Sequence, residues 1–312
     1  MRVLLTGAAG FIGGHAYNHF SFYGDEILAI DKLTHAINLT EKIKNFIQID
    51  ISDQDLHYIA RDFKPDIIVN FAAETCVDNS IKNSYDFVVS NVLGTTNLLD
   101  ICNSLNIKIC HVSSGEVYGP SSGQAFCEND KLNPTNPYSA TMAAADLMIK
   151  AYHNVHKTPY IVVRPSDNYG PNQSAEKFIP KLLDCIVEGK KFPLYSEDDQ
   201  KREWTYVSDT ATIIRSLIHF EKSWNSTYNI SSGVMKKNVN VIEQVLKSYH
   251  EVTGEKILAC DVIHHTPDKP RYDPKYCIST KKIGGHLKIR YTSFESGIKD
   301  TVVWYLKKKC LI

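Results

Sequence analysis

The amino-acid sequence predicts an α/β fold, in which a doubly wound parallel sheet carries helices on both faces and a smaller lobe follows. Apolar runs of strand length alternate with helical patterns through the first half of the chain, which is typical of such sheets. A glycine-rich turn at residues 7–13 joins the first apolar run to the first helical pattern. With 312 residues, the chain is also longer than one ordinary domain.

The first strand, turn and helix predict a dinucleotide-binding segment. Arg2–Thr6 is an apolar run that suits a buried strand, and a helical pattern begins at Phe11. Between them, Gly7 permits a tight turn, Gly10 a close approach of backbone to a pyrophosphate, and Gly13 close contact between helix and strand. The helix N-terminus adds free N–H groups and partial positive charge, which favour phosphate.

The next strand pattern, Glu26–Ile30, ends in Asp31, where such a site places a carboxylate for the adenosine ribose. Helices are expected at Asp53–Phe63 and Asn91–Leu105. Three more apolar runs end in small or polar residues: Phe46–Ile49 before Asp50, Ile67–Phe71 before Ala72 and Ala73, and Ile107–Val112 before Ser113 and Ser114. Because ligands bind outside the carboxyl ends of parallel strands, we expect these residues to surround one crevice.

The second half of the chain predicts a lobe interleaved with the first domain. A helix is expected at Tyr138–His156, a strand at Tyr160–Arg164, and a closing helix at Ser293–Lys308. We therefore expect a nucleotide-binding domain over residues 1–171 and a substrate-binding lobe over 172–312. Within residues 203–230, Trp204–Val207 and Tyr228–Ile230 are expected as strands that return to the first domain.

Charge and cysteine usage argue against several functional classes. Basic and acidic residues both number 35, so the zero net charge gives no indication of nucleic-acid or membrane-surface binding. No run of eighteen apolar residues predicts a membrane-spanning helix. The eight cysteines form no CxxC motif and no Cys/His cluster, which predicts reduced thiols, no metal site and a cytoplasmic location.

Several motifs spread over nearly the whole chain resemble those of one enzyme family. They are TGAAGFIG (6–13), FAAE (71–74), NVLGT (91–95), SSGEVYG (113–119), YSATM (138–142), RPSDNYGP (164–171), EKFIP (176–180), REWTYV (202–207) and FESG (294–297). With these motifs, the chain resembles the extended short-chain dehydrogenases/reductases. Within them it is most similar to the nucleotide-sugar 4,6-dehydratases of the dTDP-glucose kind, which implies a Rossmann-type domain.

The resemblance also implies bound NAD and a nucleotide-sugar substrate. Asp31 would bind the adenosine ribose and disfavour the extra phosphate of NADP, although Lys32 beside it could partly offset this. The implied cofactor contacts are Gly7, Gly10, Phe11, Ile12, Gly13, Asp31, Lys32, Asp50, Ile51, Ala72, Ala73, Asn91, Ser113, Tyr138 and Pro165. The implied substrate contacts are Glu74, Asn168, Lys177, Arg202 and Asn238; cations and amides suit a diphosphate and a base.

Three residues carry the chemistry that the resemblance implies. Tyr138 would take the proton of the sugar's C4 hydroxyl as hydride moves from C4 to NAD, and Ser114 would orient the same oxygen. Glu116 would remove the C5 proton, which the new 4-ketone acidifies, while the C6 hydroxyl leaves as water. Hydride then returns to C6 and a proton to C5, so that the cofactor is regenerated.

Two positions depart from the family pattern. Met142 stands where the family places a lysine that holds the nicotinamide ribose and lowers the tyrosine pKa, and a thioether can do neither. Gly115 stands where the dTDP-glucose enzymes have an aspartate that protonates the leaving hydroxyl; GDP-mannose 4,6-dehydratases resemble this chain in lacking it. The methionine variant is similar to enzymes that act on UDP-N-acetylglucosamine, so we expect that substrate.

Other functions remain open at this point. UDP-glucuronate decarboxylases also keep the glutamate, nucleotide-sugar 4-epimerases share the fold, and a base that acts at C5 also permits coupled C5 epimerisation. A non-catalytic nucleotide-sugar-binding scaffold is the alternative outside enzymes. Similar enzymes are homodimers that pair the helices expected at Asn91–Leu105 and Tyr138–His156; in the second of these, Ala144, Met148, Ala151 and Tyr152 form an apolar stripe.

Overall fold

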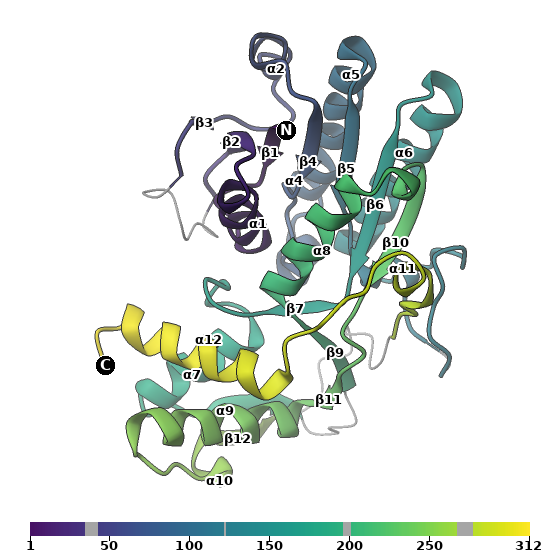
Figure 1. The fold of residues 1–312 in the computed structure, drawn as a ribbon. Helices are drawn as coiled ribbons and strands as arrows, with labels where there is room; N and C mark the ends of the chain where they lie inside the picture. The colour runs from purple at the N-terminus through teal and green to yellow at the C-terminus, as the bar shows by residue number, and fades with distance from the viewer. Residues whose placement is uncertain (35–42, 122, 196–200, 267–276) are drawn as a thin grey trace.

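A parallel sheet forms the centre of the computed structural model, which describes residues 1–34, 43–121, 123–195, 201–266 and 277–312 (Figure 1). Among these residues the sheet has seven strands in the order β10-β6-β5-β4-β1-β2-β3, and all neighbours are parallel. The strands are β1 (Arg2–Thr6), β2 (Glu26–Asp31), β3 (Phe46–Gln48), β4 (Ile67–Asn70), β5 (Lys108–Val112), β6 (Tyr160–Pro165) and β10 (Ser226–Ile230). The predicted doubly wound Rossmann-type sheet is confirmed.

Helices cover both faces of this sheet because its strands are apolar on both sides. Residues Val3, Leu4 and Leu5 of β1 are all fully buried. One face carries α1 (Phe11–Phe22) and α8 (Val207–His219); the other carries α2 (Leu56–Phe63), α5 (Gly94–Leu105) and α6 (Pro137–His156). The direction of winding reverses between β1 and β4, so a ligand site is expected at the carboxyl ends of these two strands.

Short helical segments precede α5. They are α3 (Val77–Lys82), α4 (Tyr85–Phe87) and the π-helical segment η2 (Val88–Leu93). The helix expected from Asn91 is therefore present, but its first turn is π-helical. The helix expected from Asp53 begins three residues later, because the Asp53 side chain accepts a hydrogen bond from the N–H of Asp55 at 2.9 Å and forms a turn instead.

A second lobe lies below the carboxyl ends of the main strands (Figure 1). In the described ranges it has a three-stranded sheet, β11-β9-β7, and a parallel pair, β12-β8. Its elements are β7 (Asp167–Tyr169), α7 (Phe178–Val187), β8 (Phe192–Tyr195), β9 (Lys201–Tyr206), β11 (Met235–Lys237), α9 (Asn238–Thr253), α10 (Ala259–Val262), β12 (Ile263–Thr266) and α12 (Phe294–Lys308). Helices α7, α9 and α12 share an apolar core with Tyr169 and Trp204. The short segment η4 (Glu221–Ser223) precedes β10, and Lys282 of α11 (Lys281–Gly284) donates a hydrogen bond to the Thr227 carbonyl of β10 at 2.8 Å.

One expected strand lies elsewhere than predicted. The strand around Trp204 does not return to the main sheet; it belongs to β9, which pairs with β7 and β11. An aromatic, strand-forming run does not specify its partner, and here Trp204 packs into the core of the second lobe. The segment after it does return, since α8 packs beside α1 and β10 pairs with β6. The domain boundary at residue 171 stays a prediction.

Candidate active site

The turn after β1 has the close approaches that a dinucleotide site requires. Gly7 has a φ of +68°, and a Cβ there would lie 2.5 Å from the backbone nitrogen of Ala72. A Cβ at Gly13 would lie 2.0 Å from the carbonyl oxygen of Gly7, so helix α1 can sit this close to the turn only without a side chain. Gly10 caps α1 and lines the adjoining cavity, which places the helix N-terminus at the cavity.

That cavity lies at the carboxyl ends of β1 to β4 and has an open volume of about 550 Å³. Its lining residues are Gly7, Ala9, Gly10, Asp31, Lys32, Thr34, Ile49, Asp50, Ile51, Phe71, Ala72, Ala73, Glu74 and Ser90. The Asp31 carboxylate accepts hydrogen bonds from the N–H groups of Ala9, at 3.0 Å, and Leu33, at 2.8 Å, which fix it at the rim. Glycine turn, helix N-terminus and ribose-side carboxylate together fit a dinucleotide.

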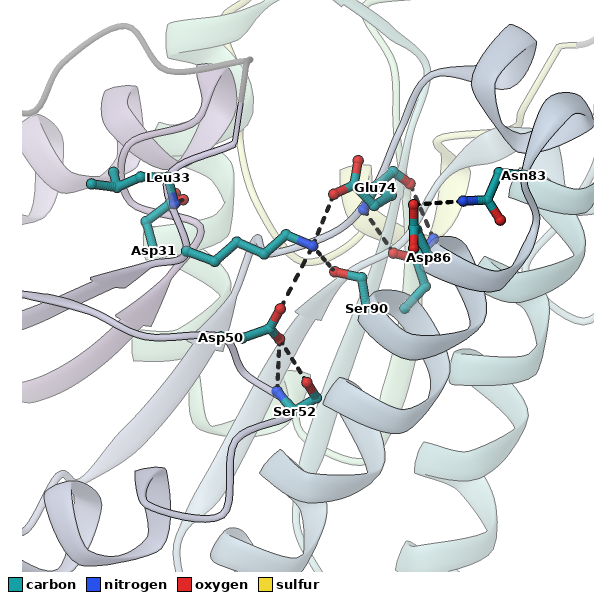
Figure 2. Close-up of polar contacts among 10 residues, drawn as sticks. Asp31, Leu33, Asp50, Ser52, Glu74, Asn83, Asp86 and Ser90 are labelled. Carbon is teal, nitrogen blue, oxygen red and sulfur yellow. Dashed lines mark hydrogen bonds and ion pairs between the residues drawn. The ribbon is translucent and has the colours of Figure 1, made fainter.

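Polar contacts connect the walls of this cavity (Figure 2). Asp50 accepts hydrogen bonds from the N–H and hydroxyl of Ser52, both at 2.9 Å, so its carboxylate has a fixed position. Lys32 reaches Glu74 with its Nζ 2.9 Å from Oε1. The sequence predicts Glu74 as a substrate contact, yet the structure places it in the cofactor cavity wall.

Asn91 is expected to contact the cofactor, but its side chain binds protein groups. It accepts a hydrogen bond from the N–H of Glu74 at 2.8 Å and donates to the Glu74 carbonyl and to the Thr141 hydroxyl, both at 3.0 Å. Thr141 in turn donates to the carbonyl of Tyr138. Asn91 therefore joins the cavity wall to helix α6.

The three predicted catalytic residues come from two segments whose local structure brings them together. Ser114 starts the short 3-10 helical turn η3 (Gly115–Tyr118), and its Oγ accepts a hydrogen bond from the N–H of Glu116 at 3.1 Å. Tyr138 lies in the first turn of α6, which Asn136 caps with a hydrogen bond from Ser139 at 2.9 Å. Hydrogen bonding between Ser114 and Tyr138, and the charge of Glu116, both act on the tyrosine.

The electrostatics of the trio oppose ionisation. Burial raises the pKa of Tyr138, the negative charge of Glu116 raises it further, and the hydrogen bond with Ser114 acts in the opposite direction. The pKa of Glu116 is also raised, chiefly by burial. Asp167 adds to this rise, whereas Arg202, Lys177 and a hydrogen bond with Asn136 favour the charged carboxylate. Glu116 therefore has the environment of a general base whose pKa lies above the ordinary range.

Met142 faces an apolar environment one turn after Tyr138. It is 2% exposed and lies in a cluster with Phe87, Val117 and Ala143 that also contains Tyr138. The family lysine is thus replaced by a packed thioether, and Tyr138 gains no cation from this position.

Residues predicted to bind the substrate approach the trio from the second lobe. Arg202, on β9, donates from Nη1 to Asp167 Oδ2 at 3.0 Å, and Lys177, which precedes α7, donates to the Thr75 carbonyl at 3.2 Å. Asn168, on β7, keeps a buried Oδ1 that no hydrogen bond reaches within the described residues, so this acceptor is available to a ligand. Asn238 starts α9.

The remaining predicted cofactor residues lie at the carboxyl ends of the same strands. Phe11 and Ile12 begin α1, Ser113 follows β5, and Pro165 ends β6. The Ser113 hydroxyl is buried without a hydrogen-bond partner in the part of the chain that the structure describes.

Sequence reasoning did not single out Asp167 or Asn136, both of which act on Glu116. The signal for Asp167 in the sequence is that it is the acidic residue of the motif RPSDNYGP (164–171). Its importance follows from the pairing of β7 with β9, which places it beside Arg202. Asn136 was visible as a helix-capping type just before Pro137, a pattern that marks a helix start.

Comparison with known proteins shows the family of this chain. Residues 3–231 match the model of the NAD dependent epimerase/dehydratase family. The chain is 33% identical over 334 residues to dTDP-glucose 4,6-dehydratase from Neisseria gonorrhoeae, covering 99% of this chain and 96% of that protein. The crystal structure of dTDP-glucose 4,6-dehydratase from Streptomyces venezuelae, solved with NAD, superposes with a TM-score of 0.90 at 31% identity and covers 99% and 98% of the two chains.

A 4-epimerase has a similar structure. UDP-glucose 4-epimerase from Thermus thermophilus, in complex with NAD, superposes with a TM-score of 0.88 at 25% identity, covering 98% of this chain and 99% of that one. Within the described ranges no helix is both long and apolar enough to cross a membrane; the cytoplasmic location stays a prediction.

The family is NAD dependent, which confirms the predicted cofactor. The glycine turn, the trio of Ser114, Glu116 and Tyr138, and the comparisons lead to one assignment. This chain belongs to the NAD dependent epimerase/dehydratase family, and within it to the extended short-chain dehydrogenases/reductases that resemble the nucleotide-sugar 4,6-dehydratases.

Proposed function

We propose that this enzyme is a nucleotide-sugar 4,6-dehydratase and that its substrate is UDP-N-acetylglucosamine. The observation that carries the reaction type is the placement of Glu116 beside Tyr138 and Ser114, with its pKa raised by burial. Oxidation at C4 needs only a tyrosine and a hydroxyl, whereas elimination across C5 and C6 also needs a base at C5. The substrate rests on the resemblance of the Met142 variant to enzymes of that specificity.

In this proposal each residue has one role. Ser114 orients the C4 oxygen and Tyr138 accepts its proton, while bound NAD supplies the hydride acceptor and donor. Once the C4 ketone has formed, Glu116 removes the C5 proton and passes it to the C6 hydroxyl, which leaves as water. After C6 has been reduced, a proton from solvent reaches C5 through Glu116. Arg202 and Lys177 bind the diphosphate, since both cations approach the site from the second lobe.

Mass spectrometry of the products tests this proposal. Purified enzyme is incubated separately with UDP-N-acetylglucosamine, dTDP-glucose, UDP-glucose and UDP-glucuronate. We expect loss of one water from UDP-N-acetylglucosamine and from no other substrate at a comparable rate. Loss of carbon dioxide from UDP-glucuronate would indicate a decarboxylase, and an isomer of unchanged mass would indicate the 4-epimerase alternative, which the similar Thermus structure keeps open. Binding without turnover would indicate a scaffold.

We also propose that the configuration at C5 is open to inversion, because Glu116 is the group that exchanges the C5 proton. The product formed in deuterated water is examined by NMR for the configuration and isotope at C5. Deuterium at C5 with inverted configuration would establish epimerisation, and deuterium with retained configuration would limit the enzyme to dehydration.

A further inference from the structure

The side chain of Lys32 is held inside the cofactor cavity wall by three acceptors. Its Nζ lies 2.9 Å from Glu74 Oε1, 3.2 Å from Ser90 Oγ and 3.7 Å from Asp50 Oδ2. An ammonium group has three N–H donors and no acceptor. Two acceptors, Glu74 and Ser90, lie within hydrogen-bond distance of Nζ, and the Asp50 carboxylate lies at ion-pair distance. Figure 2 shows Glu74, Asp50 and Ser90 converging from three different segments.

The charges of the wall oppose an added phosphate. Among the described lining residues, Asp31, Asp50 and Glu74 are carboxylates and Lys32 is the sole cation. Burial lowers the pKa of Lys32, but the hydrogen bond and charge of Glu74, together with Asp50, more than offset this and raise the pKa overall. The lysine is thus a charged side chain whose charge is already neutralised by its neighbours.

Glu74 is fixed before any ligand binds. Asn91 bonds both its N–H and its carbonyl, at 2.8 and 3.0 Å, so the backbone at residue 74 has one position. The Glu74 side chain is 17% exposed, which limits water as a competing partner for Lys32. This arrangement holds the Lys32 ammonium at Glu74.

We propose that Glu74 is a cofactor-specificity residue: by holding the Lys32 ammonium against Ser90 and Asp50, it denies that cation to a 2′-phosphate and so excludes NADP. Sequence alone suggested that Lys32 weakens the discrimination that Asp31 provides. With the lysine held by Glu74, Ser90 and Asp50, the three carboxylates of the described lining outnumber its one cation, and the wall carries excess negative charge. A ribose with a free 2′-hydroxyl is then accepted and a phosphorylated one repelled.

Direct binding of both nucleotides by isothermal titration calorimetry tests this inference, with protein first freed of bound nucleotide. We expect the wild type to bind NAD more tightly than NADP. Glu74→Gln keeps the backbone contacts of Asn91 and weakens the hold on Lys32, because the neutral amide no longer attracts the ammonium with a full negative charge. It should therefore improve the NADP affinity relative to NAD by about tenfold or more, the effect of one charged hydrogen bond.

Two further variants separate the release of Lys32 from simple removal of negative charge. In Glu74→Gln/Lys32→Met the gain should disappear, because it requires the freed ammonium. Asp86→Asn, a nearby carboxylate that bonds Asn83 and not Lys32, should leave the ratio unchanged. Thermal melts and NAD affinity check folding in each case.

Wild-type protein that binds both nucleotides equally would overturn the inference. So would an unchanged ratio in Glu74→Gln, or a gain that survives the loss of Lys32. The inference depends on the cofactor and not on the proposed substrate. Product analysis can therefore contradict the proposed substrate while calorimetry supports the role of Glu74, and the reverse.

Discussion

At the scale of single residues, Asp167 and Arg202 set the charge that Glu116 experiences. Burial raises the pKa of Glu116 most. Asp167, which bonds Arg202 at 3.0 Å, raises it further, whereas Arg202, Lys177 and Asn136 lower it. A base must be deprotonated to act. The acid limb of the activity profile should therefore lie above the pKa of about 4.3 that an ordinary glutamate has.

Asp167→Asn should move that acid limb to lower pH by up to about one unit. The substitution removes a negative charge that raises the pKa of Glu116, and that charge no longer offsets the positive charge of Arg202, which lowers that pKa. The pH dependence of C5 proton exchange measures the shift. Asp62→Asn, which removes an exposed carboxylate on α2, is the control and should leave the profile in place. An acid limb that stays fixed in Asp167→Asn would mean that Asp167 does not act on the base.

Replacing the base itself separates the two halves of the reaction. Glu116→Gln should retain substrate binding and C4 oxidation while slowing C5 proton removal by roughly 10²–10⁴-fold, the usual contribution of a general base. Single-turnover reduction of the cofactor reports the first step, and solvent deuterium at C5 reports the second. Deuterium incorporation at the wild-type rate would assign the base to another residue.

At the scale of elements, helix α6 carries both the tyrosine and its altered support. Its start is fixed by Pro137 and by the capping box of Asn136 with Ser139. Four residues after Tyr138, Met142 fills the apolar cluster beneath the tyrosine. Because burial raises the pKa of Tyr138, we expect activity to climb toward alkaline pH, where more of the phenol is ionised.

Met142→Lys tests this account of the helix. The ammonium replaces a packed thioether, so the free energy of unfolding should fall by roughly 1–3 kcal/mol. The melting temperature should then fall by a few degrees. The new cation should also lower the Tyr138 pKa, moving the alkaline rise to lower pH. Met142→Leu keeps the volume and should leave the profile unchanged. A stable lysine variant with an unshifted profile would contradict the argument.

At the scale of the whole molecule, the outer face of α5 and α6 is the surface through which we expect two copies of the chain to form a homodimer. The predicted stripe stays a prediction. Two of its residues, Met148 and Tyr152, are partly buried against the core of this subunit, and Tyr152 bonds Asp100 on α5. The exposed apolar residues of α6 are Leu147 and Val155, at 58% and 72%. We propose that these two residues, with Ala151 between them, form the helix-pairing face of a homodimer.

Leu147→Glu/Val155→Glu should therefore give a monomer, whereas the wild type should be a dimer by light scattering at micromolar concentration. A charge at a buried apolar contact opposes association, while exposed positions tolerate the change in the isolated fold. Leu258→Glu alters an exposed leucine of the second lobe and is the matched control. A monomeric wild type would end the proposal.

The sequence predicted local structure well where one segment carries the whole signal. The turn from Arg2–Thr6 into α1 depends on three glycines, at positions 7, 10 and 13, within one short segment, and it is present as expected. Features set by distant partners were not predictable. Trp204 pairs in the second sheet through β7, and Lys32 bonds Glu74 far along the chain. A side chain's sequence neighbours do not reveal which acceptor it will reach in space.

The bridge that Asn91 makes between Glu74 and Thr141 has a kinetic consequence. Glu74 in the cavity wall cannot move away from α6 without breaking the hydrogen bonds through Asn91 and Thr141, and Thr141 also bonds the Tyr138 carbonyl. Local unfolding that moves the wall at Glu74 should therefore also loosen the turn that carries Tyr138. We therefore expect that a form opened at this wall also lacks a positioned Tyr138 and does not carry out C4 oxidation.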